Sequence, residues 1–161
     1  ELIVCKIGKD SLKEIALSTI GSFKAVEMWM HAAHHLTKGP AFVANHELLY
    51  GRIYETISKD FDTIVEKMIY QLNDEECACP VLISSIAAQT LQNYESPANL
   101  PDSEISMYSL VLIVDHIKAL EALKLTLEKE GVLSLGMDDF LAAACNQYES
   151  FAYMINQKLK Y

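Results

Sequence analysis

The sequence predicts an all-α protein built as a four-helix bundle. Hydrophobic residues recur at steps of three and four along almost the whole chain, which is the period of an amphipathic helix. Glycine and proline are few, six and four in 161 residues, whereas an all-β fold rich in tight turns needs more of them. The turn residues gather at four places, and they divide the chain into four long helical segments and one short one.

The first half of the chain is expected to form two long helices. The first begins near Leu12, where Asp10 or Ser11 can act as its N-cap, and it ends at Gly39-Pro40. The second runs from about residue 45 to residue 72, because no strong helix breaker interrupts this stretch.

The second half is expected to add one short helix and two long ones. The short helix lies within residues 80–92, and a loop follows at residues 96–101. The third long helix starts at Asp102 or Ser103 as N-cap and reaches about residue 130. The fourth carries a hydrophobic stripe over residues 137–159. The connection between the second and third long helices must then include a long crossover along the bundle.

Length and composition set further expectations. A chain of 161 residues with 51% hydrophobic residues is expected to fold as one domain, residues 1–161, with a substantial core. The net charge of −9 argues against a general affinity for nucleic acid, whose phosphates need lysine and arginine. Only Lys6 and Lys9 are basic near the start, so DNA binding through a basic tail is not expected.

The cysteines and the hydropathy pattern indicate the compartment. Of the four cysteines, only Cys77 and Cys79 are close in sequence, and their spacing is not that of a zinc knuckle. Reduced thiols in a reducing compartment are therefore expected. No apolar run approaches membrane-spanning length, and the first residues are unlike a signal peptide. These observations predict a cytoplasmic protein without membrane contact.

Histidines gather around the break between the first two helices. His31 and His34 stand three residues apart near the end of the first helix, so they share one face of it, and His46 opens the second helix. Imidazole is the commonest protein ligand for transition metals. The segment therefore predicts a helical hairpin that directs several imidazoles to one place.

The order of elements and four motifs together resemble the Dps family of ferritin-like proteins, over nearly the whole chain. The motifs, in chain order, are His31-Ala32-Ala33-His34 with Lys38-Gly39 and His46-Glu47; Asp62 with Glu66; Asp115-His116-Ile117-Lys118-Ala119-Leu120; and residues 138–151. The resemblance implies a ferritin-like four-helix bundle with a short extra helix in the connection between the second and third long helices. It also implies a hollow homo-dodecamer that oxidises Fe(II) and stores ferric iron, and so limits oxidative damage.

The resemblance also implies where the ferroxidase site lies. In this family the site is formed between two subunits at a two-fold interface. His34 and His46 match the histidines of one chain, and Asp62 and Glu66 match the carboxylates of the other. These four are the expected catalytic and iron-binding residues of a ferroxidase, an oxidoreductase acting on metal ions. Mixed imidazole and carboxylate ligands suit iron better than thiolates do.

The sequence departs from the family pattern at two points in the second helix. The family has an aspartate four residues after the helix-B histidine, whereas Tyr50 stands here, a poor ligand because a phenol titrates near ~10. Tyr50 is nevertheless kept as a further candidate ligand. The distance from His46 to Asp62 is also one residue longer than usual. An extra residue rotates the rest of a straight helix by about 100°, and a π-bulge near Gly51 would absorb it.

Other interpretations stay open at this stage. His34, His46, Asp62 and Glu66 could form an interface salt-bridge cluster without metal. The chain could also be a Dps-like cage whose oxidase site is degenerate at Tyr50, with a structural or DNA-protective role. His31 is expected to be a non-ligand, His116 a hydrogen-bonded structural residue and Glu47 an ordinary solvated charge.

Overall fold

Long helices form nearly the whole molecule. The computed structural model describes the backbone of residues 2–160 and the side chains of residues 12–160, and this part of the chain contains no strand. The helical elements are α1 (Leu2–Leu36), α2 (Phe42–Ala44), η1 (Asn45–Gly51), α3 (Arg52–Leu72), η2 (Glu75–Ala78), α4 (Pro80–Leu91), α5 (Asp102–Lys129) and α6 (Leu135–Leu159). Because α2, η1 and α3 are continuous, four long helices result, and the predicted all-α four-helix bundle is confirmed.

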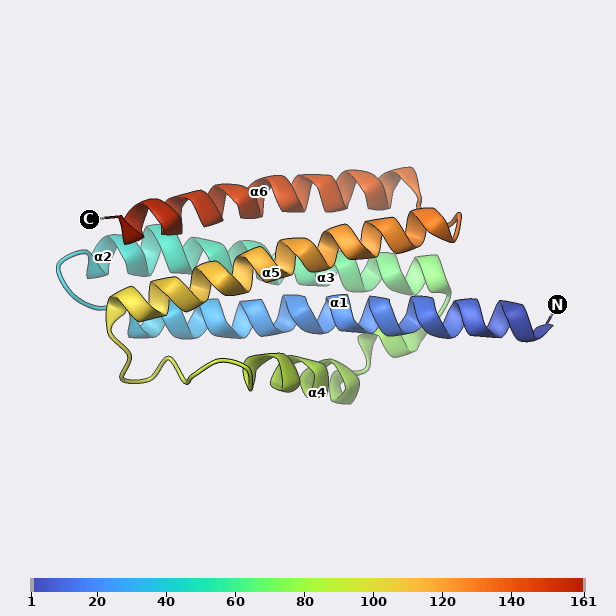
Figure 1. The fold of residues 1–161 in the computed structure, drawn as a ribbon, viewed down its shortest axis with the longest axis horizontal. Helices are drawn as coiled ribbons and strands as arrows, with labels where there is room; N and C mark the ends of the chain where they lie inside the picture. Colours follow the sequence, from blue (N-terminus) through green and yellow to red (C-terminus); the bar gives the residue numbers. More distant parts are fainter. Residues whose placement is uncertain (1, 161) are drawn as a thin grey trace.

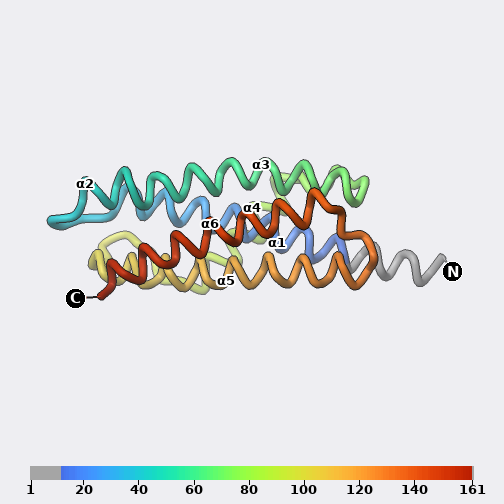
Figure 2. The backbone as a smooth tube through the Cα atoms, turned by 90° about the horizontal axis from the view of Figure 1, so that it is seen from above, coloured from blue at the N-terminus to red at the C-terminus, as the bar shows by residue number. Residues whose placement is uncertain are grey.

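The chain direction reverses between α1 and α3 and again between α5 and α6 (Figure 1). Between α3 and α5 the chain returns along the whole bundle, so these two helices run in the same direction. The short helix α4 lies within this return and packs against α1, outside the four-helix bundle. Figure 2 shows α3 and α5 on opposite sides of the bundle. The predicted short helix and crossover are therefore both confirmed.

Several helix ends differ from the expectation. α1 already begins at Leu2, so Asp10 and Ser11 lie inside it and the expected N-cap there is wrong. Residue types that cap helices also occur inside them, so the sequence did not distinguish the two positions. The second long helix starts at Phe42, three residues early, just after the turn at Gly39, whose φ of 89° suits glycine.

The ends of α5 and α6 have clear local causes. Pro101 is the N-cap residue of α5, so the expected cap at Asp102 or Ser103 is wrong. α5 closes with the paired bonds of a Schellman motif, from the Val132 N–H to the Leu127 carbonyl and from Gly131 to Glu128. Ser134 caps α6 by accepting a hydrogen bond from the Met137 N–H.

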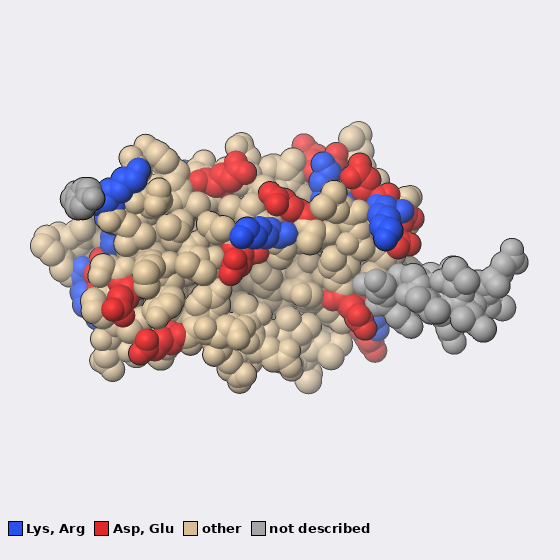
Figure 3. All heavy atoms as spheres, viewed as in Figure 1, with Lys and Arg blue, Asp and Glu red and all other residues tan. Residues whose placement is uncertain are grey.

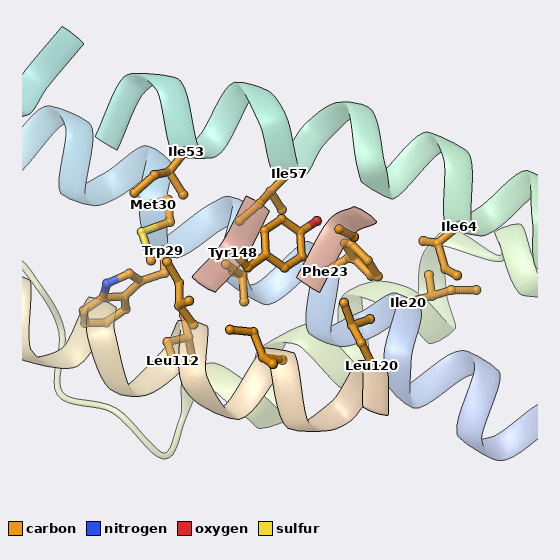
Figure 4. Packing of buried hydrophobic residues seen from close by; sticks show 14 of the residues in the cluster. Ile20, Phe23, Trp29, Met30, Ile53, Ile57, Ile64, Leu112, Leu120 and Tyr148 are labelled. Atoms are coloured by element: carbon orange, nitrogen blue, oxygen red, sulfur yellow. The ribbon is translucent and has the colours of Figure 1, made fainter. Parts of the chain in front are cut away.

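The core fills the space between the four long helices (Figure 4). The apolar stripe of α3 shows why the sequence folds this way, since Ile53, Ile57, Ile64 and Met68 recur at helical spacing and are fully buried. Phe23 from α1, Leu120 from α5 and Tyr148 from α6 meet this stripe. Trp29 is also in the core, where its indole N–H donates to the Ser109 hydroxyl over 2.9 Å.

Polar groups inside the core are mostly hydrogen-bonded. His116 is buried, and its Nδ1 lies 2.6 Å from the Ser22 hydroxyl, which confirms the expected structural role. Burial lowers the pKa of His116 to about 3, so the imidazole is neutral. The Tyr148 hydroxyl donates to Asp60 across 2.5 Å. Burial raises the pKa of both Tyr148 and Asp60.

On the face drawn in Figure 3, acidic and basic side chains are interspersed, and neither kind forms one continuous patch across the face. Within residues 2–160, no helix combines the length and the apolarity that a membrane crossing requires.

Candidate functional site

The second long helix contains a π-helical segment at the position where the sequence predicted a bulge. This segment, η1, covers Asn45–Gly51, and the helix continues as a regular α-helix from Arg52. A π turn holds one residue more than an α turn, so it absorbs the extra residue between His46 and Asp62. The predicted π-bulge near Gly51 is therefore confirmed.

Gly51 lets the ring of His34 approach this π turn. A Cβ atom at Gly51 would lie 3.0 Å from His34 Nδ1 and 2.6 Å from the His46 carbonyl oxygen. Both contacts are shorter than side chains ordinarily make, so the imidazole of His34 occupies space that only glycine leaves free.

His34 and His46 hold each other in a reciprocal pair. His34 Nδ1 lies 2.5 Å from the carbonyl oxygen of His46, and His46 Nδ1 lies 2.7 Å from the carbonyl oxygen of His34. The two rings stack with centroids 3.7 Å apart and planes inclined by 15°. A carbonyl oxygen only accepts, so Nδ1 carries the proton in both rings. In the neutral form each Nε2 then has a free lone pair, which is the state a metal ligand requires.

Glu47 brings a carboxylate to this pair. Its Oε1 lies 3.2 Å from Nε2 of His46, and its side chain is 68% exposed. If His46 is neutral, two acceptor atoms face each other at this distance, and a proton or a cation between them satisfies both. The expected solvent exposure of Glu47 is confirmed, and its contact with His46 is an addition that the sequence did not predict.

Tyr50 points into the core. Its side chain has no exposed surface, and its hydroxyl is hydrogen-bonded to the Ser106 hydroxyl over 2.7 Å. Burial raises the pKa of Tyr50 to about 12, so the phenol is protonated at neutral pH. Ser106 also accepts from Lys158, which pairs with Asp102 at 2.6 Å. This placement gives Tyr50 a structural role in a buried polar network and does not favour it as a metal ligand.

Asp62 and Glu66 lie on the exposed surface of α3, away from the histidine pair of the same chain. The rise of a helix places Asp62 about 24 Å along the axis from His46. Asp62 lines a shallow hollow of about 280 Å³ with Tyr54, Glu55, Ser58 and Lys59. Within the described side chains of one chain, no three histidine, cysteine or acidic groups are arranged to hold a metal. The four residues predicted from the sequence therefore do not meet within one subunit.

Two more histidines lie beside the His34–His46 pair. His31 and His35 are exposed on α1, and the ring centroid of His35 lies 5.2 Å from that of His34. Tyr54 from α3 stacks on His31, with centroids 4.3 Å apart. Desolvation, followed by the neighbouring charges of His31, His34 and His46, lowers the pKa of His35. The end of the bundle thus carries four imidazoles close together.

Comparison with solved structures supports the fold. A structure of a mutant Dps1 from Mycobacterium smegmatis superposes with a TM-score of 0.72 over 95% of this chain and 97% of that chain, at 15% sequence identity. No protein-family model matches the sequence, and no curated protein matches it. At this identity the similarity establishes the fold, so the chain has a Dps-like, ferritin-like helical bundle.

Proposed function

We propose that the chain is the subunit of an iron-sequestering cage that oxidises Fe(II) and stores ferric iron. The observation that carries the proposal is the reciprocal pair of His34 and His46, which directs both Nδ1 protons to backbone carbonyls, so that in the neutral rings both Nε2 lone pairs can bind metal. The Dps-like fold supports the same function, since the matched protein is a Dps.

The remaining ligands would come from a second copy of the chain. Tyr54 lies midway in sequence between His46 and Asp62, so we place a two-fold axis perpendicular to α3 near Tyr54. It would place Asp62 of the partner subunit beside His46 and Glu66 of the partner subunit about one turn further along. The hollow that Asp62 lines would then face the histidine end of the other chain. We extend the proposal to a closed homo-oligomer, with twelve subunits as the family resemblance implies.

The proposed ligand set fits iron. Two imidazoles, the Glu47 carboxylate and the partner's two carboxylates give the mixed nitrogen and oxygen ligands that iron accepts, without a thiolate. Carboxylates favour Fe(III) over Fe(II) because they are hard anionic ligands, so the site favours loss of an electron from Fe(II) to peroxide or dioxygen. Glu47 would take the place of the carboxylate that the family has where Tyr50 stands.

A second candidate function is a cage of the same fold whose oxidase site is degenerate, with a structural or protective role. The observation that favours it is the burial of Tyr50 beside a glycine, since neither residue can replace the family's aspartate. Ferrous oxidation kinetics distinguish the two functions. An iron cage oxidises Fe(II) faster than buffer does and retains the ferric product, whereas a degenerate cage assembles but does neither.

Variants of the carboxylates test which groups bind iron. Glu66→Gln and Glu47→Gln should each slow ferrous oxidation about tenfold or more without disturbing assembly, because both side chains are exposed in the single chain. Glu121→Gln, an exposed glutamate on α5, is the matched control and should leave the rate unchanged. Oxidation rates of Glu66→Gln and Glu47→Gln that equal those of Glu121→Gln and wild type would contradict the proposal.

Mixed assemblies test whether the site is shared between subunits. His46→Ala and Glu66→Gln are each expected to oxidise Fe(II) at least about tenfold more slowly when assembled alone. In a dimer with one copy of each, one of the two shared sites keeps its full ligand set, so random co-assembly should restore about a quarter of the activity. A site formed within one chain would recover no activity, and that result would refute the shared arrangement.

A further inference from the structure

We propose that His31 and His35 form a second metal site, separate from the proposed iron site, which binds a late first-row divalent cation such as Zn²⁺, Cu²⁺ or Ni²⁺. Neither residue belongs to the ligand set argued above. Unlike that set, both of its protein ligands come from one chain.

The geometry of α1 brings the two rings together. His31 and His35 are one helical turn apart, both are exposed, and their ring centroids lie 4.6 Å apart with planes inclined by 38°. Two histidines at this spacing on one face of a helix can chelate one zinc ion. Both imidazoles are exposed in the single chain, so further ligands can reach a metal ion that the pair holds.

The surroundings hold one ring in place and leave both available. The ring of Tyr54 stacks on His31 with an inclination of 22°, which restricts the rotation of that imidazole. Among the described side chains, neither His31 nor His35 is hydrogen-bonded to another protein group. A ligand that is already oriented loses less side-chain entropy when it binds.

His34 lies close to His31 and His35 but interacts with His46 instead. Its Nδ1 is bonded to the carbonyl of His46 and its ring is stacked on that of His46, whereas its centroid is 6.2 Å from that of His31. The His31–His35 pair offers only imidazole nitrogen, whereas the His34–His46 pair lies beside the Glu47 carboxylate. Pure imidazole ligation favours copper, nickel and zinc over Fe(II), following the usual order of affinity. The net charge of −9 also attracts divalent cations.

Copper and zinc titrations of the assembled protein without iron test this site. Cu²⁺ bound to the intact protein should give an electron paramagnetic resonance spectrum with coupling to two nitrogen atoms. His31→Ala and His35→Ala should each lower Zn²⁺ affinity, measured by calorimetry, at least about tenfold. Met28→Ala, on the same exposed face of α1, should keep wild-type affinity.

The outcomes separate this site from the proposed iron site. The double variant Asp62→Asn/Glu66→Gln should keep the copper spectrum, and His35→Ala should keep ferrous oxidation. In a His46→Ala background, where the proposed iron site has lost an imidazole, copper coupling that survives in both His31→Ala and His35→Ala would overturn the proposal, as would loss of the coupling in the Asp62/Glu66 double variant. Absence of Cu²⁺ and Zn²⁺ binding by the intact assembly would overturn it as well.

Discussion

Substitution of Tyr50 by aspartate decides whether this position faces the metal or the core. By the family resemblance alone, Tyr50→Asp restores a missing carboxylate and should raise iron affinity. By the structure, it should destabilise the protein, because the aromatic ring is fully buried and its hydroxyl is bonded to Ser106. Loss of a buried aromatic side chain costs about 3–5 kcal/mol. The new carboxylate would also lie near Asp102, which already forms an ion pair with Lys158, so the two negative charges would repel each other.

Tyr50→Phe is the matched variant, since it keeps the ring and removes only the hydroxyl. Ser106 keeps its bond to Lys158, so we expect a loss of about 1 kcal/mol. The measurement is urea unfolding at equal subunit concentrations, because stability of an oligomer depends on concentration, together with iron stoichiometry. A Tyr50→Asp protein that stays within about 1 kcal/mol of wild type and binds more iron would refute the placement of Tyr50 in the core.

Three further perturbations test other parts of the structure. Gly51→Ala should lower the free energy of unfolding in urea by about 1–3 kcal/mol, because the new Cβ would displace His34 and break both hydrogen bonds of the His34–His46 pair. Gly136→Ala is the control: the nearest atom to its Cβ would be Lys67 Nζ at 3.6 Å, so the change should be neutral or stabilising by up to about 1 kcal/mol. Burial acts to raise the pKa of Asp102, but bonds from Lys158, Thr37 and the Lys38 N–H outweigh it and lower the pKa. The bonds of the Asp102 carboxylate therefore stabilise the fold above the unfolded pKa near ~3.9, and this stabilisation is lost as the pH falls through the lower pKa of the folded state. Lys158→Met should move the midpoint of acid unfolding, followed by circular dichroism, to higher pH. The pKa of His116 is about 3 in the folded protein and near ~6.5 in the unfolded chain, so between these values each pH unit of acidification should lower the free energy of unfolding by about 1.4 kcal/mol. His116→Phe should flatten this slope in urea unfolding at pH 4 to 6. An unchanged slope would mean that His116 is accessible to protons.

The helical period was sufficient to predict most of the fold. The stripe predicted over residues 137–159 is buried in α6, at Met137, Leu141, Tyr148, Phe151 and Ile155. The crossover also followed, because a short helix and a loop separate the second and third long segments. The family resemblance also indicated one extra residue between His46 and Asp62, and the π turn that would absorb it is present at Asn45–Gly51.

The direction of individual side chains could not be predicted in the same way. The sequence does not show which residue of a π turn is the additional one, so it left Tyr50 equally able to face the interface or the core. Asp102 looked like a cap, but it bonds Lys158, which is 56 residues away and is brought near only by the packed bundle. Glu47 is solvated as expected, but its contact with His46 could not be predicted because it depends on the orientation of the His46 ring, whose Nδ1 is bonded to the His34 carbonyl. The meeting of Asp62 and Glu66 with the histidines stays a prediction.

Anomalous scattering at the iron edge, from crystals soaked in ferrous salt, tests the central claim most directly. The account predicts an iron peak within coordination distance of Nε2 of His34 or His46 in one protomer and of Asp62 or Glu66 of the partner subunit. Iron bound at any other place, or a crystal in which no partner's α3 reaches the histidine pair, would contradict it.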